Sequence, residues 1–240
     1  GAAGGLGAGQ SGGAGGAPAA QGAGWAGETP RDDDRDDGVQ LAQLAASLRA
    51  TQPDVIDALD PGQDGAARRK FLARVQGEIT KRGTIDVLRH GIKHGPLPLD
   101  LFYGTPSPDN AKAKERFEAN RFSVTRQLRY SRDETQRALD VGLFINGLPV
   151  ATFELKNSLT KQTVDDAVEQ YQRDRDPREK LFAFGHCVFH FAVDEHEVLF
   201  CTHLKGQGSW FHALNPGCKS GSRKHHTPHA LNTDALTNYS

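Results

Sequence analysis

Hydrophobic residues recur at helical spacing in the part of the chain that follows its first 38 residues. In residues 39–50, VQLAQLAASLRA, leucine and alanine return every three or four positions. Residues 64–83, DGAARRKFLARVQGEITKRG, repeat this pattern and end on Gly83, which is typical of a helix C-cap. Residues 84–104 begin with helical spacing and continue as an extended segment, and TPSPDN after them predicts a turn. We therefore expect this stretch to be mainly helical.

From Arg121 onward the pattern changes to short strands. RFSVTRQLRYS (121–131) alternates apolar and polar positions, and LDVGLFINGLPVATFELKN (139–157) resembles two strands around a turn. A predicted helix, TVDDAVEQYQRDR (163–175), starts with the spacing of a capping box. CVFHFAVD and EVLFCTHL then predict a second strand pair. This order of elements predicts an α/β fold with a central mixed sheet flanked by helices.

The two ends of the chain have a different composition. Residues 1–30 are almost all Gly, Ala, Ser, Gln and Pro, and RDDDRDDG follows them. We expect residues 1–38 to be a flexible, partly acidic arm, residues 39–215 to form the folded domain, and residues 216–240 to be an irregular tail. Because the chain contains no Met, we expect it to be a processed, cut or incomplete product.

The net charge of −1 and the three cysteines exclude few classes of protein. An odd number of widely spaced cysteines without a signal peptide favours a reducing cytoplasm over a disulfide framework. No apolar run approaches the roughly 20 residues of a membrane span. Buried structural cysteines are favoured over two alternative zinc sets, of which the first is His186, Cys187, His190, Cys201 and His203, and the second is Cys218, His225, His226 and His229.

Three charged residues lie on the predicted 139–157 hairpin, although sheet cores disfavour unpaired charge. A two-residue turn would place Asp140 opposite Phe153 and turn Glu154 to the other face. A three-residue loop with a bulge would pair Asp140 with Thr152 and gather Asp140, Glu154 and Lys156 on one face. We favour the three-residue loop, because the opposite face is then wholly apolar, with Leu139, Val141, Leu143, Ala151, Phe153 and Leu155.

Two carboxylates on neighbouring strands suit Mg²⁺, and the carbonyl of Leu155 could add a ligand. Lys156, roughly 7 Å beyond Glu154 on the same face, is placed to orient or help deprotonate a metal-bound water, or to stabilise charge growing on a phosphate. These groups suit hydrolysis of a phosphodiester. The alternative is surface decoration of an ordinary hairpin.

Basic residues precede and follow this hairpin. Arg126, Arg129, Arg132 and Arg137 either contact DNA phosphates or form a solvated strand end. The alternating charges of YQRDRDPREK (171–180) favour a surface of salt bridges over a DNA clamp.

Asp140, thirteen further residues and then Glu154-Leu155-Lys156 resemble the PD-(D/E)xK nuclease signature. The segments RGTIDVLRHGIKHGPLPLDLFYGTPSP, NRFSVTRQLRYS, ALDVGLFINGLPVATFELKN and DAVEQYQRDRDPREKLF are more specific. They resemble the N-terminal nuclease domain of the R subunit of type I restriction–modification enzymes. The resemblance covers about Lys70 to Asn215.

This resemblance implies a restriction-endonuclease-like fold and Mg²⁺-dependent cleavage of unmodified foreign double-stranded DNA. It implies Asp140 and Glu154 as metal ligands, Lys156 as a catalytic residue and Gln170 as a helper on the following helix. A Tyr is expected four residues after that Gln, where this chain has Asp174, and Tyr171 lies beside Gln170 instead.

The same resemblance implies modification and specificity subunits as partners. ATP would act only through a motor domain, since no Gly-x-x-x-x-Gly-Lys-Ser/Thr occurs in this sequence. The alternative is a catalytically degenerate module of the same fold that binds DNA or docks a motor or partner subunit.

Overall fold

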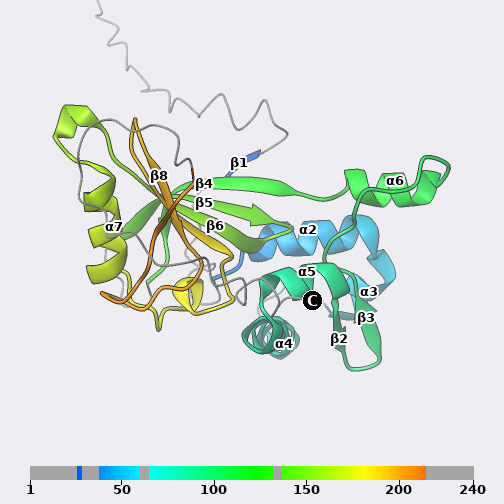
Figure 1. Cartoon of the computed structure of the whole chain (residues 1–240). Helices are drawn as coiled ribbons and strands as arrows, with labels where there is room; N and C mark the ends of the chain where they lie inside the picture. The colour runs from blue at the N-terminus through cyan, green and yellow to red at the C-terminus, as the bar shows by residue number, and fades with distance from the viewer. Residues whose placement is uncertain (1–25, 29–37, 60–64, 132–136, 215–240) are drawn as a thin grey trace, which may run out of the picture.

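A seven-stranded mixed sheet forms the centre of the protein (Figure 1). The computed structural model describes residues 26–28, 38–59, 65–131 and 137–214. The sheet order is β1-β4-β5-β6-β7-β8-β9, which confirms the predicted α/β class. Its strands are β1 (Ala26–Glu28), β4 (Phe122–Arg129), β5 (Ala138–Ile145), β6 (Leu148–Leu155), β7 (Phe189–Val193), β8 (Val198–Cys201) and β9 (His212–Ala213).

Helices and a small separate hairpin complete the described part. The α-helices are α2 (Leu41–Thr51), α3 (Pro53–Leu59), α4 (Ala66–Arg82), α5 (Thr84–His90), α6 (Ala111–Glu118) and α7 (Val164–Arg173). Two 3-10 turns span Ser158–Thr160 and Lys180–Phe182. The hairpin consists of β2 (Ile92–His94) and β3 (Leu97–Leu99).

The predicted helices in the first half are confirmed. Helix α4 ends at Gly83, whose φ of 83° is accessible to glycine and whose N–H donates to Ile79 O at 2.7 Å. Two further helices were not predicted. Pro53 begins α3, as proline at the first helical position often does. Helix α6 has no buried residue to create a periodic signal, and it starts at Asn110, whose side chain accepts from Ala113 N.

The parallel strands β6 and β7 are joined through α7. Parallel neighbours need such a crossover, and α7 packs on both strands. The predicted capping box is present, because Thr163 N donates to Asp166 Oδ2 at 2.6 Å. Val164, Ala167 and Tyr171 lie at helical spacing on the buried face of α7. Helix α7 is therefore fixed against the strand that carries Glu154.

The core has one large cluster at the end of the sheet near the β5–β6 turn. Helices α2 to α5 gather there, while α7 lies beside the opposite end of the sheet (Figure 1). Leu44, Leu48, Phe71 and Val75 are buried in this cluster together with Leu148 of β6. A second cluster includes Tyr130, Leu139, Tyr171 and Phe182. The hairpin β5–β6 thus connects the two clusters.

Strand β1 was not anticipated, because it lies within residues predicted to form a flexible arm. Ala26, Gly27 and Glu28 pair in parallel with Ser123, Val124 and Thr125 of β4. This pairing satisfies backbone groups of β4 that an edge strand would leave open. Of the predicted arm, residues 1–25 and 29–37 lie outside the described residues, as do residues 215–240.

The two described cysteines bear out the structural prediction. Cys187 and Cys201 are buried free thiols. Within the ranges that the structure describes, no group of three or more His, Cys, Asp or Glu residues could hold a metal ion, so the first zinc set does not form. Cys218 and its neighbouring histidines lie outside those ranges. No described helix has the length and apolar character to cross a membrane.

Candidate active site

The β5–β6 turn has two residues, so the predicted three-residue loop was wrong. Asn146 and Gly147 have φ of 48° and 82°, as in a type I′ hairpin turn, and Ile145 pairs with Leu148. The register then shifts between Leu143 and Phe144: Phe144 pairs with Pro149, whereas Leu143 pairs with Ala151. A β-bulge at Val150 therefore adds the odd residue that we had placed in the loop.

Pro149 gives a physical reason for this bulge. Proline has no N–H to donate to a neighbouring strand, and inside sheets it is confined to edges and bulges. The carbonyl of Val150 accepts a hydrogen bond on the other side of β6, where Val188 N, just before β7, donates to it at 3.2 Å. Beyond the bulge, Gly142 pairs with Thr152 and Val141 with Phe153, and the next residues along the two strands are Asp140 and Glu154. The predicted pairing of Asp140 with Thr152 was therefore wrong, because Thr152 pairs with Gly142. That Asp140 and Glu154 share one face stays a prediction.

Two polar residues of β6 are almost fully buried. Thr152 and Glu154 are each 1% exposed, because α7 covers them. On the opposite face Phe153 is half-buried and stacks on Phe191 at 4.8 Å, and Leu155 is 46% exposed. The carboxylate of Glu154 thus lies in an interior with little water.

Asp140 is tied directly to the Glu-Leu-Lys triplet. Its Oδ2 accepts the backbone N–H of Leu155 at 2.7 Å, and its Oδ1 accepts from Gln127 Nε2 at 3.3 Å. Gln127 has a φ of 51°, a conformation that is uncommon for residues other than glycine. Each carboxylate oxygen has two lone pairs, so these bonds leave Asp140 capacity for a further ligand.

Glu154 is paired with Arg175, a residue that the sequence did not single out. Arg175 Nε donates to Glu154 Oε1 at 2.8 Å, and Nη2 of the same guanidinium donates to the same oxygen. The two side chains are 3% and 1% exposed. Because both bonds end on Oε1, Oε2 lies outside this pair.

Burial raises the pKa of Glu154 from 4.5 to about 7. The positive charge of Arg175 and its hydrogen bonds oppose this rise, Asp140 adds to it, and Lys156 opposes it. Asp140 and Lys156 are therefore close enough to Glu154 to act on its charge.

Lys156 and Gln170 are brought together from different elements. Lys156 Nζ, just beyond the end of β6, donates to Gln170 Oε1 on α7 at 2.6 Å. The backbone of Lys156 is held by β7, because its N–H donates to Val193 O at 2.8 Å. Lys156 and Gln170 of the predicted set are therefore in direct contact, while Asp140 contacts the backbone of Leu155 between Glu154 and Lys156.

Tyr171 anchors α7 to the middle of β6. Its hydroxyl and Thr152 Oγ1 are 2.9 Å apart, and Thr152 Oγ1 also lies 2.8 Å from His190 Nδ1. Tyr171 and His190 are both fully buried, and desolvation lowers the pKa of His190 to about 3. His190 is therefore a neutral structural residue. This anchoring role is available to Tyr171 beside Gln170, whereas Asp174 only ends the helix.

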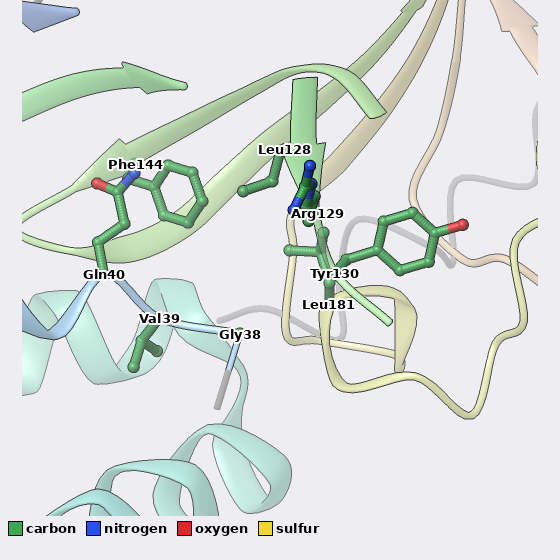
Figure 2. A pocket seen from close by; sticks show the side chains of 8 residues that line it. All are labelled: Gly38, Val39, Gln40, Leu128, Arg129, Tyr130, Phe144 and Leu181. Carbon is green, nitrogen blue, oxygen red and sulfur yellow. The ribbon is translucent and has the colours of Figure 1, made fainter. Parts of the chain in front are cut away.

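The predicted DNA-binding arginines are less closely grouped. Arg126 pairs with Val141, the neighbour of Asp140, so its side chain points to the opposite face. Arg129 is exposed and lines a crevice beside Gln40 and Tyr130 (Figure 2). Arg132 lies outside the described residues.

The crevice in Figure 2 is too small for a substrate. Its volume is about 10 Å³, near the space of one water position. It lies where the chain before α2 meets β4, and Gln40 there donates to Thr125 Oγ1 and accepts from Ser123 Oγ. These contacts are structural, so the open end of the hairpin remains the candidate site.

The donor set at that end fits Mg²⁺. The ion needs one or two carboxylates when water and phosphate oxygens complete its shell, and Asp140 and Glu154 Oε2 provide two. Zinc would instead favour His and Cys ligands. The side chain of Leu155 is exposed, and its carbonyl remains a predicted further ligand.

Arg175 is the main residue of the site that sequence reasoning missed. It belongs to the stretch 171–180 that we interpreted as a surface of salt bridges. That interpretation holds for Arg173, which pairs with Glu169, and for Arg178, which pairs with Asp176. Arg175 differs because it lies just past the end of α7, where it turns inward to Glu154. The sequence offers no signal that separates it from the other two.

One comparison with known proteins gives a match. Residues 103–209 match the family described as Type I restriction enzyme R protein N terminus (HSDR_N), and no curated protein sequence matches the chain. The matched segment contains Asp140, Glu154, Lys156 and Gln170, and it confirms the resemblance found in the sequence. Residues 103–209 are therefore similar to the N-terminal part of type I restriction enzyme R proteins.

Proposed function

We propose that this chain carries a DNA endonuclease domain that hydrolyses phosphodiester bonds with Mg²⁺. The observation that supports this most is the hydrogen bond from Leu155 N to Asp140 Oδ2. It fixes the aspartate to the centre of the Glu-Leu-Lys triplet, so that two carboxylates and one ammonium converge beside α7. Surface decoration would require neither this bond nor the contact of Lys156 with Gln170.

Each residue has a role in this proposal. Asp140 and Glu154 Oε2 would hold the ion, which supplies Lewis acidity and a more acidic water when bound. Lys156 stabilises the negative charge that develops on the phosphate oxygens. Gln170 accepts from Lys156 Nζ and thereby sets the direction of the ammonium, while its amide N–H groups are available to a DNA phosphate.

The wider system follows from the family. The R proteins of type I restriction enzymes imply unmodified double-stranded DNA as substrate, with modification and specificity subunits as partners. ATP-driven movement of DNA would come from a motor domain of the R protein. Arg126, Arg129 and Arg132 remain proposed phosphate contacts.

A plasmid-cleavage assay with the full 240-residue chain tests the proposal. We expect Mg²⁺-dependent nicking or cutting of supercoiled DNA that is lost in Asp140→Asn and in Lys156→Ala. Lys205→Ala, which removes an exposed lysine outside the proposed catalytic set, is the matched control and should retain cleavage. Equal cleavage by the parent and both site variants would refute the proposal.

A second candidate function is a non-catalytic module that binds DNA or docks a partner subunit. Two observations favour it: Arg175 already neutralises Glu154, and Asp174 stands where the family pattern expects Tyr. Calorimetric titration with Mn²⁺ separates the candidates. The nuclease predicts binding that Glu154→Gln abolishes, and the non-catalytic module predicts none.

A further inference from the structure

Arg175 is held in one orientation by three groups besides Glu154. Its Nη1 donates to the hydroxyl of Tyr130 at 2.7 Å, and its Nη2 donates to the carbonyl of Ala138 at 3.0 Å. Its guanidinium carbon also lies 5.2 Å from the centre of the Tyr130 ring. These partners come from β5 and from the end of β4, so the position of Arg175 is set by the sheet as well as by Glu154.

The hydrogen bonds of Arg175 constrain Glu154 in turn. Two donors of the rigid guanidinium converge on Oε1, which fixes the plane in which the carboxylate can lie. A buried glutamate with a single mobile partner could rotate about its last bond, whereas this one is locked. The oxygen left outside the pair is Oε2.

A surface role does not explain this arrangement. Arg173 and Arg178, on either side in the sequence, form exposed ion pairs of the kind that contribute little to stability. Burying a charged pair is costly and is often no better than apolar packing. The buried Arg175–Glu154 pair therefore calls for a reason other than stability.

We propose that Arg175 is a positioning residue of the candidate metal site: it holds Glu154 by Oε1 so that Oε2 faces a divalent cation beside Asp140. This inference rests on the proposed function. It adds a residue that acts through Glu154 and contacts neither ion nor DNA. Hydrogen-bond partners of metal ligands act in this way in other metalloproteins, where their loss weakens metal binding.

The test measures Mn²⁺ binding by the full 240-residue chain without DNA. Binding is monitored through the electron paramagnetic resonance signal of free Mn²⁺. Four substitutions are compared with the parent: Glu154→Gln, Arg175→Lys, Tyr130→Phe and Arg173→Lys. Arg175→Lys keeps the charge and removes the planar fork, and Tyr130→Phe removes one anchor of Arg175 while leaving Glu154 and Arg175 intact. Arg173→Lys is the matched control on the exposed side of the same segment. Thermal unfolding of each variant is recorded in parallel.

We expect Arg175→Lys to weaken Mn²⁺ binding by about 10- to 100-fold, Tyr130→Phe to weaken it less, and Arg173→Lys to leave it unchanged. Parent affinity in Arg175→Lys, even with a lower melting temperature, would show a purely structural role and overturn the proposal. Tighter binding would overturn it too, because Arg175 would then compete with the cation. If Arg175→Lys does not fold, Tyr130→Phe decides: weakened binding supports the proposal and parent affinity overturns it.

The same titration separates this proposal from the proposed function. If the parent shows no binding that depends on Glu154, both fail. If binding depends on Glu154 but not on Arg175 or Tyr130, the metal site stands and only the positioning role fails.

Discussion

The two ends of the β5–β6 hairpin both bury polar groups but use them differently. At the turn, Asn146 Nδ2 donates to Leu101 O and Asn120 Oδ1, and its Oδ1 accepts from Arg121 N. The carbonyl of Gly147 accepts from Gln40 N. At the open end, Asp140, Glu154 and Lys156 carry charge and retain donor or acceptor capacity after their observed bonds.

This difference teaches how one pair of strands can serve both stability and chemistry. The polar groups of the turn are matched with backbone and side-chain partners, and the bond from Gln40 N to Gly147 O joins the turn to the start of α2. The charged groups of the open end are held in direction by Leu155, Arg175 and Gln170, and they still offer oxygen and N–H groups to a ligand. We therefore expect substitutions at the turn to affect mainly stability and those at the open end to affect mainly activity.

The largest effect on stability is expected from Gly147→Ala. Gly147 has a φ of 82°, and an added Cβ would lie 2.4 Å from Gln40 O and 2.7 Å from Leu44 N of the α2 region. We expect the free energy of unfolding to fall by about 3 kcal/mol, from backbone strain and overpacking together. Urea denaturation measures it.

Gly95→Ala is the matched control for this substitution. Gly95 also has a positive φ, of 61°, but nothing lies within 4 Å of an added Cβ. We expect a loss of about 1 kcal/mol there from the left-handed conformation alone. Equal losses at Gly95 and Gly147 would break the view that the turn is docked tightly on α2.

The next effect concerns the middle of the hairpin and depends on pH. His190, beside Thr152, has a pKa lowered to about 3 by burial. A histidine that stays neutral in the folded protein contributes full stability above its unfolded pKa of about 6.5, and this stability is lost as the pH falls toward 3. We expect a loss of about 2 kcal/mol between pH 7.5 and pH 5.

His190→Gln is the comparison for that measurement, because glutamine does not titrate. The pH dependence that Glu154 contributes has the opposite sign. Because its pKa is raised in the folded protein, its contribution to stability falls as the pH rises from about 4.5 to about 7. Both proteins keep Glu154, so the difference between their denaturation curves at each pH isolates His190. Parallel pH profiles would contradict the neutral, buried assignment.

A smaller effect is expected where α7 is anchored. Tyr171→Phe removes the hydrogen bond to Thr152 Oγ1 and should lower the free energy of unfolding by about 1 kcal/mol. A double-mutant cycle with Thr152→Val measures the coupling between the two side chains. Full additivity would mean that the hydroxyl of Tyr171 does not hold the helix that carries Gln170.

The smallest effect on stability is expected at the open end. Lys156 is half-buried and its ammonium donates to Gln170, and such contacts contribute little to folding. Lys156→Ala should change the free energy of unfolding by roughly 0.5 kcal/mol or less, whereas under the proposed function it should remove DNA cleavage. A loss comparable to that of Gly147→Ala would erase the distinction between the two ends.

Much of this architecture could be predicted from the sequence, because hydrophobic spacing reports directly which face of an element is buried. It correctly indicated α2, α4, α7 and the alternation of strands from Phe122 onward. A shared face for Asp140, Glu154 and Lys156 was inferred from keeping apolar residues together on the other side, and it stays a prediction. That argument determines only whether the number of extra residues in the hairpin is odd or even. It could not distinguish a three-residue loop from a two-residue turn followed by a β-bulge. Pro149 was the available signal, since proline cannot donate within a sheet.

Other features depend on tertiary contacts that leave no periodic signal. Arg175 is one of several arginines in an alternating run, and only the path of the chain after α7 decides that it turns inward. Strand β1 has three residues and exists through its pairing with β4. Helix α6 buries nothing. Thr152, Tyr171 and His190 come from three elements, so their contact could be found only once β6 and β7 were known to be parallel neighbours.

The bulge at Val150 makes the chemistry of β6 depend on a count of residues. Removing any one residue between the turn and Glu154 would rotate the rest of the strand by half a period, sending the glutamate and lysine outward and Phe153 and Leu155 inward. Among relatives of this chain, the number of positions from the turn to the acidic residue should therefore vary less than the identities of the residues that fill them.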